Sequence, residues 1–156
     1  MDAFIEGFQI ALQPVNIFWI ILGGFLGTIV GMLPGLGPAT AVAVLIPVTF
    51  GMDPTSALIL MAAIYYGAMY GGSRSSILLN TPGDGSAIAA TFDGYPMAKK
   101  GQAGEAMAIS AVASFIGGIF AAIGFILLAK PLANFAIKFG PAEYFRLMLF
   151  TLSAIV

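Results

Sequence analysis

The sequence predicts an all-α integral membrane protein, a multi-helix bundle with discontinuous or re-entrant helices of which this chain holds only a part. Of its 156 residues, 60% are hydrophobic and 8% are charged, and the mean hydropathy is +1.00. Soluble domains carry about 25% charged residues. Proline and glycine also cluster at two points inside apolar stretches. These clusters predict helix breaks, because a bilayer tolerates irregular backbone only within protein or beside a water-filled cavity.

The composition excludes several classes of function. The net charge of −1 gives no basic field, so nucleic acid is not an expected partner. The chain has no histidine and no cysteine. Their absence removes disulfides, thiolate or imidazole metal sites, and cysteine or histidine catalysis. We therefore expect no cofactor and no transition-metal site.

The N-terminal part is predicted to contain two helices. In residues 1–15, apolar side chains recur at helical spacing opposite acidic and amide side chains, which is typical of an amphipathic helix in the membrane interface. Residues 16–33 are predicted to form the first membrane helix. Its small-residue stripe has glycines four positions apart at Gly23, Gly27, Gly31 and Gly35. Such a stripe favours close packing against another helix.

Residues 34–50 hold the first break. Two prolines and two glycines fall between Pro34 and Pro38, and the apolar segment that follows is too short to span a bilayer alone. A half-helix or re-entrant segment is therefore predicted. Gly35, Gly37 and Pro38 are candidate substrate-binding residues, because the free N–H groups at a helix start suit an anion. A tight turn between two helices at the surface explains the same pattern.

Residues 54–80 are predicted to form a broken membrane helix, capped by Asp53 and with Pro54 at its first position. Its small residues at the same spacing are Ala63, Gly67, Gly71 and Ser75. We expect this stripe to meet the first one. The Gly-Gly pair that ends at Gly72 predicts a bend in the helix.

Arg74 is the only charged residue within residues 54–83. An arginine beside a bend inside the membrane suits a bidentate carboxylate, so Gly71, Gly72, Ser73 and Arg74 are candidate substrate-binding residues. Two alternatives stay open. In the first, Arg74 lies at the end of a membrane span and reaches the lipid headgroups. In the second, Arg74 bonds to backbone carbonyls.

The second break follows at Asn80-Thr81-Pro82-Gly83-Asp84-Gly85. Its side-chain and main-chain oxygens suit a hard cation such as sodium, so Asn80, Thr81 and Gly83 are candidate cation-binding residues. An ordinary helix stop with an Asx-type turn explains these residues equally well. No other metal is expected.

The rest of the chain alternates polar and apolar segments. We predict a polar loop at 81–103 that can include short helical pieces, a membrane helix at 104–129, a connector at 131–140 and the start of a truncated membrane helix at 142–156. The last apolar run ends without a cap or turn, so the chain is interpreted as a fragment of a longer protein. The lysines on both sides of the 104–129 helix leave the membrane orientation open.

Two motifs carry a family resemblance. They are GTIVGMLPGLGP at residues 27–38 and YGAMYGGSRSSILLNTPG at residues 66–83. With these motifs in this order, the sequence resembles the large permease subunit of the tripartite tricarboxylate transporters, and the resemblance covers essentially the whole chain. It implies a multi-pass protein of the bacterial inner membrane, surrounded by lipid.

The resemblance also implies partners and a mechanism. A small membrane subunit and a periplasmic substrate-binding protein would work with the permease. The substrate would be a di- or tricarboxylate such as citrate, and a sodium or proton gradient would drive its uptake. By analogy with other secondary transporters, the break at 34–38 and the break at 73–83 would face each other near the bilayer midplane.

Two other classes of function are weighed against the transporter. A membrane scaffold or passive channel fits the small-residue stripes but gives no reason for polar backbone in the membrane. An intramembrane aspartyl protease needs two carboxylates that share a proton within the membrane. Asp84 and Asp93 do not lie within an apolar span. We therefore predict that the protein is not an enzyme and has no catalytic residues.

Overall fold

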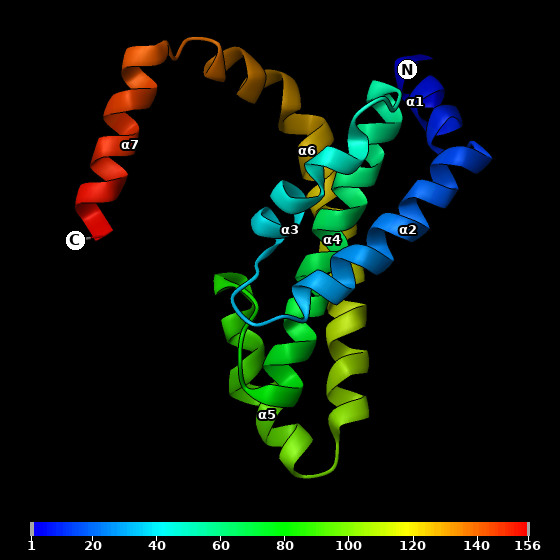
Figure 1. Cartoon of the computed structure of the whole chain (residues 1–156), viewed down its shortest axis with the longest axis vertical. Coiled ribbons are helices and arrows are strands. Elements are labelled where there is room, and N and C mark those ends of the chain that lie inside the picture. Colours follow the sequence, from blue (N-terminus) through cyan, green and yellow to red (C-terminus); the bar gives the residue numbers. More distant parts are fainter. Residues whose placement is uncertain (1, 156) are drawn as a thin grey trace. The chain divides into compact units, whose positions relative to one another are not determined.

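The computed structural model describes residues 2–155, with side chains for residues 5–154, and the described part contains helices and turns but no strand (Figure 1). The chain divides into two units, Met1–Ser114 and Phe115–Val156. One helix, α6 (Ala103–Ala136), contributes residues to both units. Each unit is described by itself.

The first unit places short helices around two long ones. Its elements are α1 (Asp2–Ala11), α2 (Pro14–Gly31), α3 (Pro38–Leu45), the 3₁₀ helix η1 (Ile46–Thr49), α4 (Pro54–Leu79), the 3₁₀ helix η2 (Gly85–Ile88), α5 (Ala89–Lys99) and the beginning of α6. Helices α2, α3 and α4 all begin with proline, whose missing N–H costs nothing at that position. The Asp53 carboxylate accepts the N–H groups of Thr55 and Ser56, as its position before Pro54 predicts.

Helices α2 and α4 are held together by close backbone contact. A Cβ atom at Gly27 or Gly31 would collide with the backbone of α4, and one at Gly67 or Gly71 would collide with the backbone of α2. The prediction that the two stripes meet is therefore confirmed. Gly35 lies outside this interface, in the following turn, with a φ of +81° and open space around it.

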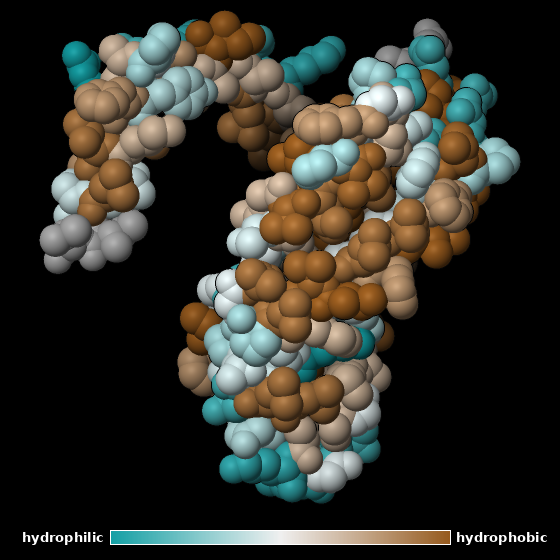
Figure 2. All heavy atoms as spheres, viewed as in Figure 1, coloured by the Kyte–Doolittle hydropathy of each residue, from teal (hydrophilic) through white to brown (hydrophobic). Residues whose placement is uncertain are grey.

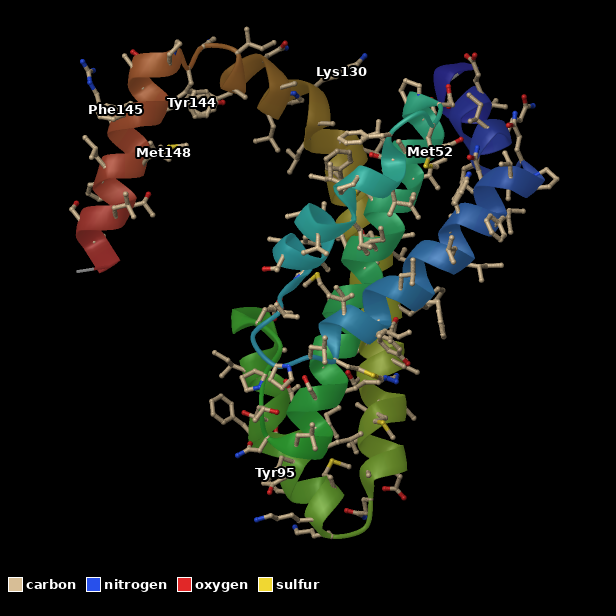
Figure 3. All side chains as sticks on the ribbon, in the orientation of Figure 1. Met52, Tyr95, Lys130, Tyr144, Phe145 and Met148 are labelled. Carbon is tan, nitrogen blue, oxygen red and sulfur yellow. The ribbon has the colours of Figure 1, made fainter. Side chains whose placement is uncertain are left out.

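The core of the first unit lies where α3 packs on α4. Ala41 from α3 is buried with Leu60, Ile64 and Ala68 from α4. Partly buried side chains packed around them include Trp19, Val30, Val42, Leu45, Met61 and Met52, which follows η1 (Figure 3). Apolar residues also cover the outer face of these helices (Figure 2), as expected of helices that face lipid or further protein.

A polar clamp joins the N-terminal ends of α2 and α4. The hydroxyl of Ser56 donates to the Asn16 side-chain oxygen at 2.7 Å, and the Asn16 amide donates to the carbonyl of Ile10 at 2.7 Å. Asn16 is 1% exposed and Ser56 is 9% exposed. Because both polar groups are buried, their mutual bond avoids an unsatisfied donor and acceptor.

The second unit consists of the rest of α6 and helix α7 (Pro141–Ile155). Aromatic rings link the two helices: Phe139 lies 5.1 Å from Phe135 and 6.1 Å from Tyr144 between ring centroids (Figure 3 labels Tyr144). Large apolar side chains such as Phe120 and Phe150 are exposed. A surface of this kind is suited to lipid or to further parts of a larger protein.

Three of the predicted segments, 54–80, 104–129 and 131–140, differ from the structure. Helix α4 is continuous to Leu79, so residues 54–80 contain no break at the Gly-Gly pair, whose glycines instead allow close packing. The segment 81–103 holds two short helices, η2 and α5, as its prediction allowed, and they cover most of its length. Helix α6 continues through Pro131 to Ala136, so the helix at 104–129 is longer than predicted and most of the connector at 131–140 is helical. A helix absorbs one proline by giving up one backbone hydrogen bond.

Two helices, α2 and α6, are long and apolar enough by length and composition to cross a membrane. Helix α4 has 26 residues, but its glycines, serines and tyrosines make it less apolar. The helical content and these two helices agree with an all-α membrane protein. The chain does leave helical geometry between α2 and α3, as predicted for residues 34–50. Whether α3 re-enters the membrane stays a prediction.

Candidate functional site

The two breaks in the helices lie against each other. A Cβ atom at Gly37, which precedes α3, would lie 3.2 Å from the Cβ of Asp84 and 3.8 Å from the carbonyl oxygen of Gly83. The turn between α2 and α3 therefore touches the turn that follows α4. We call this region the break junction and define it as Gly31, Gly37, Gly72, Gly83 and Asp84.

Glycine is required at the centre of the break junction. A Cβ atom at Gly83 would lie 2.8 Å from the Cα of Gly72 and 2.9 Å from the carbonyl oxygen of Gly31. The end of α2, the middle of α4 and the turn after α4 thus meet with backbone on backbone. Any side chain at Gly83 would push these three segments apart.

The N-terminus of α3 opens beside the break junction without a cap. Gly37 is extended, with φ −68° and ψ 173°, and no side chain caps the helix. Pro38 is buried and has no N–H to donate. The exposed residues Ala39 and Thr40 have no hydrogen-bond acceptor for their amide N–H groups among the described residues. Two free N–H donors and the positive end of a helix dipole therefore face outward here.

The turn that follows α4 supplies the oxygen atoms of this region. Asn80 ends α4 in the left-handed conformation, with φ 57° and ψ 26°, and the N–H of Thr81 bonds back to the carbonyl of Ser75 at 3.4 Å. The Asp84 carboxylate accepts the Ser86 hydroxyl at 2.8 Å and the Ala87 N–H at 2.9 Å, which caps η2. A carboxylate with lone pairs left over, near backbone carbonyls, is a set of groups that a hard cation prefers.

Arg74 does not lie at the break junction. Residues two positions apart on an α-helix point about 200° apart, so Arg74 and Gly72 lie on opposite faces of α4. The guanidinium carbon of Arg74 lies 3.6 Å from the centroid of the Tyr70 ring. Its Nε is buried without a hydrogen-bond partner, and no acidic group pairs with it within residues 5–154. A cation stacked on an aromatic ring but lacking an acceptor can still bind an anion.

The predicted substrate-binding residues therefore divide into separate groups. Gly37, Pro38 and Gly72 lie at or beside the break junction, and Gly35 lies in the exposed turn before it. Gly71 faces the backbone of α2 instead. The Ser73 hydroxyl is half-buried and donates to the carbonyl of Met69 at 3.2 Å, within its own helix. Of the predicted cation-binding residues, Gly83 lies in the break junction, whereas Asn80 and Thr81 belong to the end of α4 and the turn that leads to Gly83.

The sequence analysis missed the structural roles of two residues, Asp84 and Tyr70. Asp84 was included in the oxygen-rich stretch 80–85 and weighed as a protease-like acid, but its role as the cap of η2 was missed, although an aspartate directly before Gly85 and Ser86 is the pattern of a helix cap. Tyr70 was missed as the ring beneath Arg74, although an aromatic residue four positions before an arginine lies on the same helix face. Neither pattern by itself shows which segments will meet.

Comparison with known proteins identifies the relatives of this chain. Residues 17–156 match the family model described as Tripartite tricarboxylate transporter TctA family. The chain is 50% identical over 142 residues to an Agrobacterium vitis protein named "Uncharacterized 52.8 kDa protein in TAR-I ttuC' 3'region". The matched part is 91% of this chain, which spans only 28% of the length of that relative. No solved structure matches the chain.

Proposed function

The chain belongs to the tripartite tricarboxylate transporter TctA family, and we propose that it forms part of the membrane permease subunit of a binding-protein-dependent secondary transporter. The substrate would be a di- or tricarboxylate, and a gradient of sodium or protons would drive its uptake. A small membrane subunit and a periplasmic binding protein would complete the transporter in the bacterial inner membrane. Membership in a transporter family agrees with the prediction that the protein is not an enzyme.

The observation that supports this proposal most strongly is the break junction. Two interruptions that are more than 40 residues apart in the chain meet there, with Gly37 beside Asp84. Irregular backbone is costly in a membrane unless it lines a cavity or lies inside protein. Secondary transporters use helix ends of this kind to bind substrate and coupling ion.

We propose separate roles for the two sides of the break junction. The free N–H groups of Ala39 and Thr40 at the start of α3 would bind a substrate carboxylate. The Asp84 carboxylate and the main-chain oxygens near Asn80 and Thr81 would bind the coupling cation. A bound cation would offset the repulsion between Asp84 and an anionic substrate, so each ligand would favour binding of the other.

The position of the break junction along α2 favours a substrate site in an aqueous vestibule rather than at the bilayer midplane. Gly31 is the last residue of α2, and the 18 residues of α2 extend for about 27 Å, close to the thickness of the hydrocarbon core. If α2 alone crosses the bilayer, the break junction lies at one end of the span. We therefore place the substrate site at the base of a water-filled entrance on that side.

The test is the uptake of radiolabelled citrate into vesicles that hold the complete permease, its small membrane subunit and the binding protein. Asp84→Asn is the informative variant, because asparagine keeps the helix cap but removes the charge. We expect it to raise the cation concentration needed for half-maximal uptake by about tenfold or more. Asp93→Asn is the matched control, since Asp93 is exposed on α5 and lines a different hollow, which contains no residue of the break junction.

Equal cation dependence of the two variants would contradict the role of Asp84. Uptake that requires neither a sodium nor a proton gradient would contradict the transporter mechanism itself. The two results are distinguishable, because the first leaves gradient-driven uptake intact.

A further inference from the structure

An apolar groove runs between α2 and α4 on the side of α4 that faces away from Gly72. Its volume is about 570 Å³. The residues that matter for its chemistry are Ile20, Gly24 and Thr28 from α2 and Ala62, Tyr66 and Tyr70 from α4. The groove lies entirely within the first unit of the chain.

The lining of this groove is suited to hydrocarbon. No charged residue lines it in the part of the chain that the structure describes. The Thr28 hydroxyl donates to the carbonyl of Gly24 at 2.6 Å. Thr28 therefore offers the groove its methyl group and no free hydrogen-bond donor. Tyr66 is 57% exposed along one edge. A long apolar groove with tyrosines at its rim matches an acyl chain with its polar end near a headgroup.

A cation without an anionic partner lies one helical turn beyond the last residue of α4 that lines the groove. Arg74 follows Tyr70 by one helical turn on the same face, and its guanidinium stacks on the Tyr70 ring. Its buried Nε has no acceptor, and no carboxylate within residues 5–154 neutralises it. The Nε of Arg74 is therefore a donor available to an anion from outside the described chain, and a charged group near the membrane favours such a partner.

The dimensions fit one leaflet of a bilayer. The groove extends along α4 from Ile59 to Tyr70, which corresponds to about 16 Å of helix, and half a hydrocarbon core is about 15 Å thick. Ala68 packs against Gly31 at the end of α2. Arg74 lies about 9 Å further along α4. At that depth it reaches the level of the lipid phosphates when α2 spans the membrane.

We propose that an anionic phospholipid occupies this groove, with one acyl chain against Ile20, Ala62 and Tyr66 and its phosphate bound to Arg74. The predicted anion-binding role of Arg74 is thereby assigned to a lipid and not to the transported carboxylate. This site is independent of the break junction and does not depend on the identity of the substrate. Charge complementarity selects an anionic over a zwitterionic lipid.

Photo-crosslinking of the complete permease tests this proposal. The protein is reconstituted into phosphatidylcholine vesicles that contain a small fraction of phosphatidylglycerol with a diazirine on one acyl chain. After irradiation, peptide mass spectrometry maps the labelled residues. We expect label on α2 and α4 at Ile20, Ala62 and Tyr66, at a yield about fivefold higher than with diazirine-labelled phosphatidylcholine.

Three variants make the experiment specific. Arg74→Gln should lower the phosphatidylglycerol yield to that of phosphatidylcholine, whereas Arg74→Lys should retain part of the difference. Ala62→Phe should block the groove, because Ala62 is exposed and its side chain points into open space that a ring can fill. Arg146→Gln, which changes an exposed arginine on α7, is the matched control and should leave the yield unchanged.

Two outcomes overturn the proposal. If no label reaches the groove in the wild type, another helix of the permease covers it. If phosphatidylcholine labels the groove as strongly as phosphatidylglycerol, Arg74 does not select an anionic lipid. Both comparisons use the wild-type protein, so the test holds even if Arg74→Gln fails to fold.

Discussion

At the scale of single residues, glycine decides how closely the two long helices approach. The carbonyl of Ile64 on α4 occupies the space that a side chain at Gly27 would need. Gly24 belongs to the same helix, yet a Cβ atom there would meet nothing within 4 Å. A comparison of substitutions at Gly27 and Gly24 therefore distinguishes the packing role of glycine from its effect on helix propensity.

Gly27→Ala is expected to lower the free energy of unfolding by about 2 kcal/mol, because overpacking a tight interface costs about 1–3 kcal/mol. Gly24→Ala is expected to leave it unchanged or raise it by up to about 1 kcal/mol, since alanine favours helix over glycine. Chemical unfolding of the complete permease in detergent micelles measures both. Equal effects of the two substitutions would show that α2 and α4 do not pack through Gly27.

The polar clamp between Asn16 and Ser56 makes a second prediction at this scale. A double-mutant cycle with Asn16→Ala and Ser56→Ala should give a coupling energy of about 1 kcal/mol, as expected for a hydrogen bond between membrane helices. Replacing Ser56→Ala by Ser73→Ala in the cycle is the control, because the Ser73 hydroxyl bonds within its own helix. Coupling as large in the control as in the Ser56 cycle would rule out the clamp.

At the scale of elements, the spacing of small residues predicted correctly that the helix at 16–33 packs on the helix at 54–80. The same glycines were misread as a bend at Gly71 and Gly72. The local sequence cannot distinguish a bend from close packing, because glycine both weakens a helix and permits another helix to approach.

Helix α4 ends at Asn80, and the sequence Thr81-Pro82-Gly83 that follows was recognised as a possible helix end. The contact between Gly37 and Asp84 depends on how α2, α3 and α4 pack together, so no local pattern reports it.

Gly83→Ala tests the break junction as a unit. Its methyl group would lie 2.8 Å from the Cα of Gly72, so the turn must move away from α4. Because small displacements of a binding site cost large factors in activity, citrate uptake should fall by more than about tenfold. Gly85→Ala is the control, since a Cβ at Gly85 would meet nothing within 4 Å. Equal uptake by both variants, with unchanged elution in size-exclusion chromatography, would place the site elsewhere.

At the scale of the whole molecule, the chain belongs to a family of membrane transporter components. It spans 28% of the length of its Agrobacterium vitis relative, and many large apolar side chains in both units are exposed. Composition alone predicted the membrane environment, and the motifs at 27–38 and 66–83 predicted the family that the comparison then confirmed. The substrate, the coupling ion and the partners were inferred from the family resemblance and not from a residue pattern, because helix N-termini and oxygen-rich turns suit many anions and cations.

The most direct test of the central claim is the steady-state accumulation of labelled citrate in vesicles that contain the complete transporter, under an imposed gradient of sodium or of protons. A tenfold inward gradient of one monovalent ion supplies about 1.4 kcal/mol, so coupling to one ion predicts about tenfold accumulation. One of the two gradients should produce it, and vesicles without a gradient should only equilibrate. Equal citrate concentrations on both sides under both gradients would contradict a secondary transporter and indicate a passive pore.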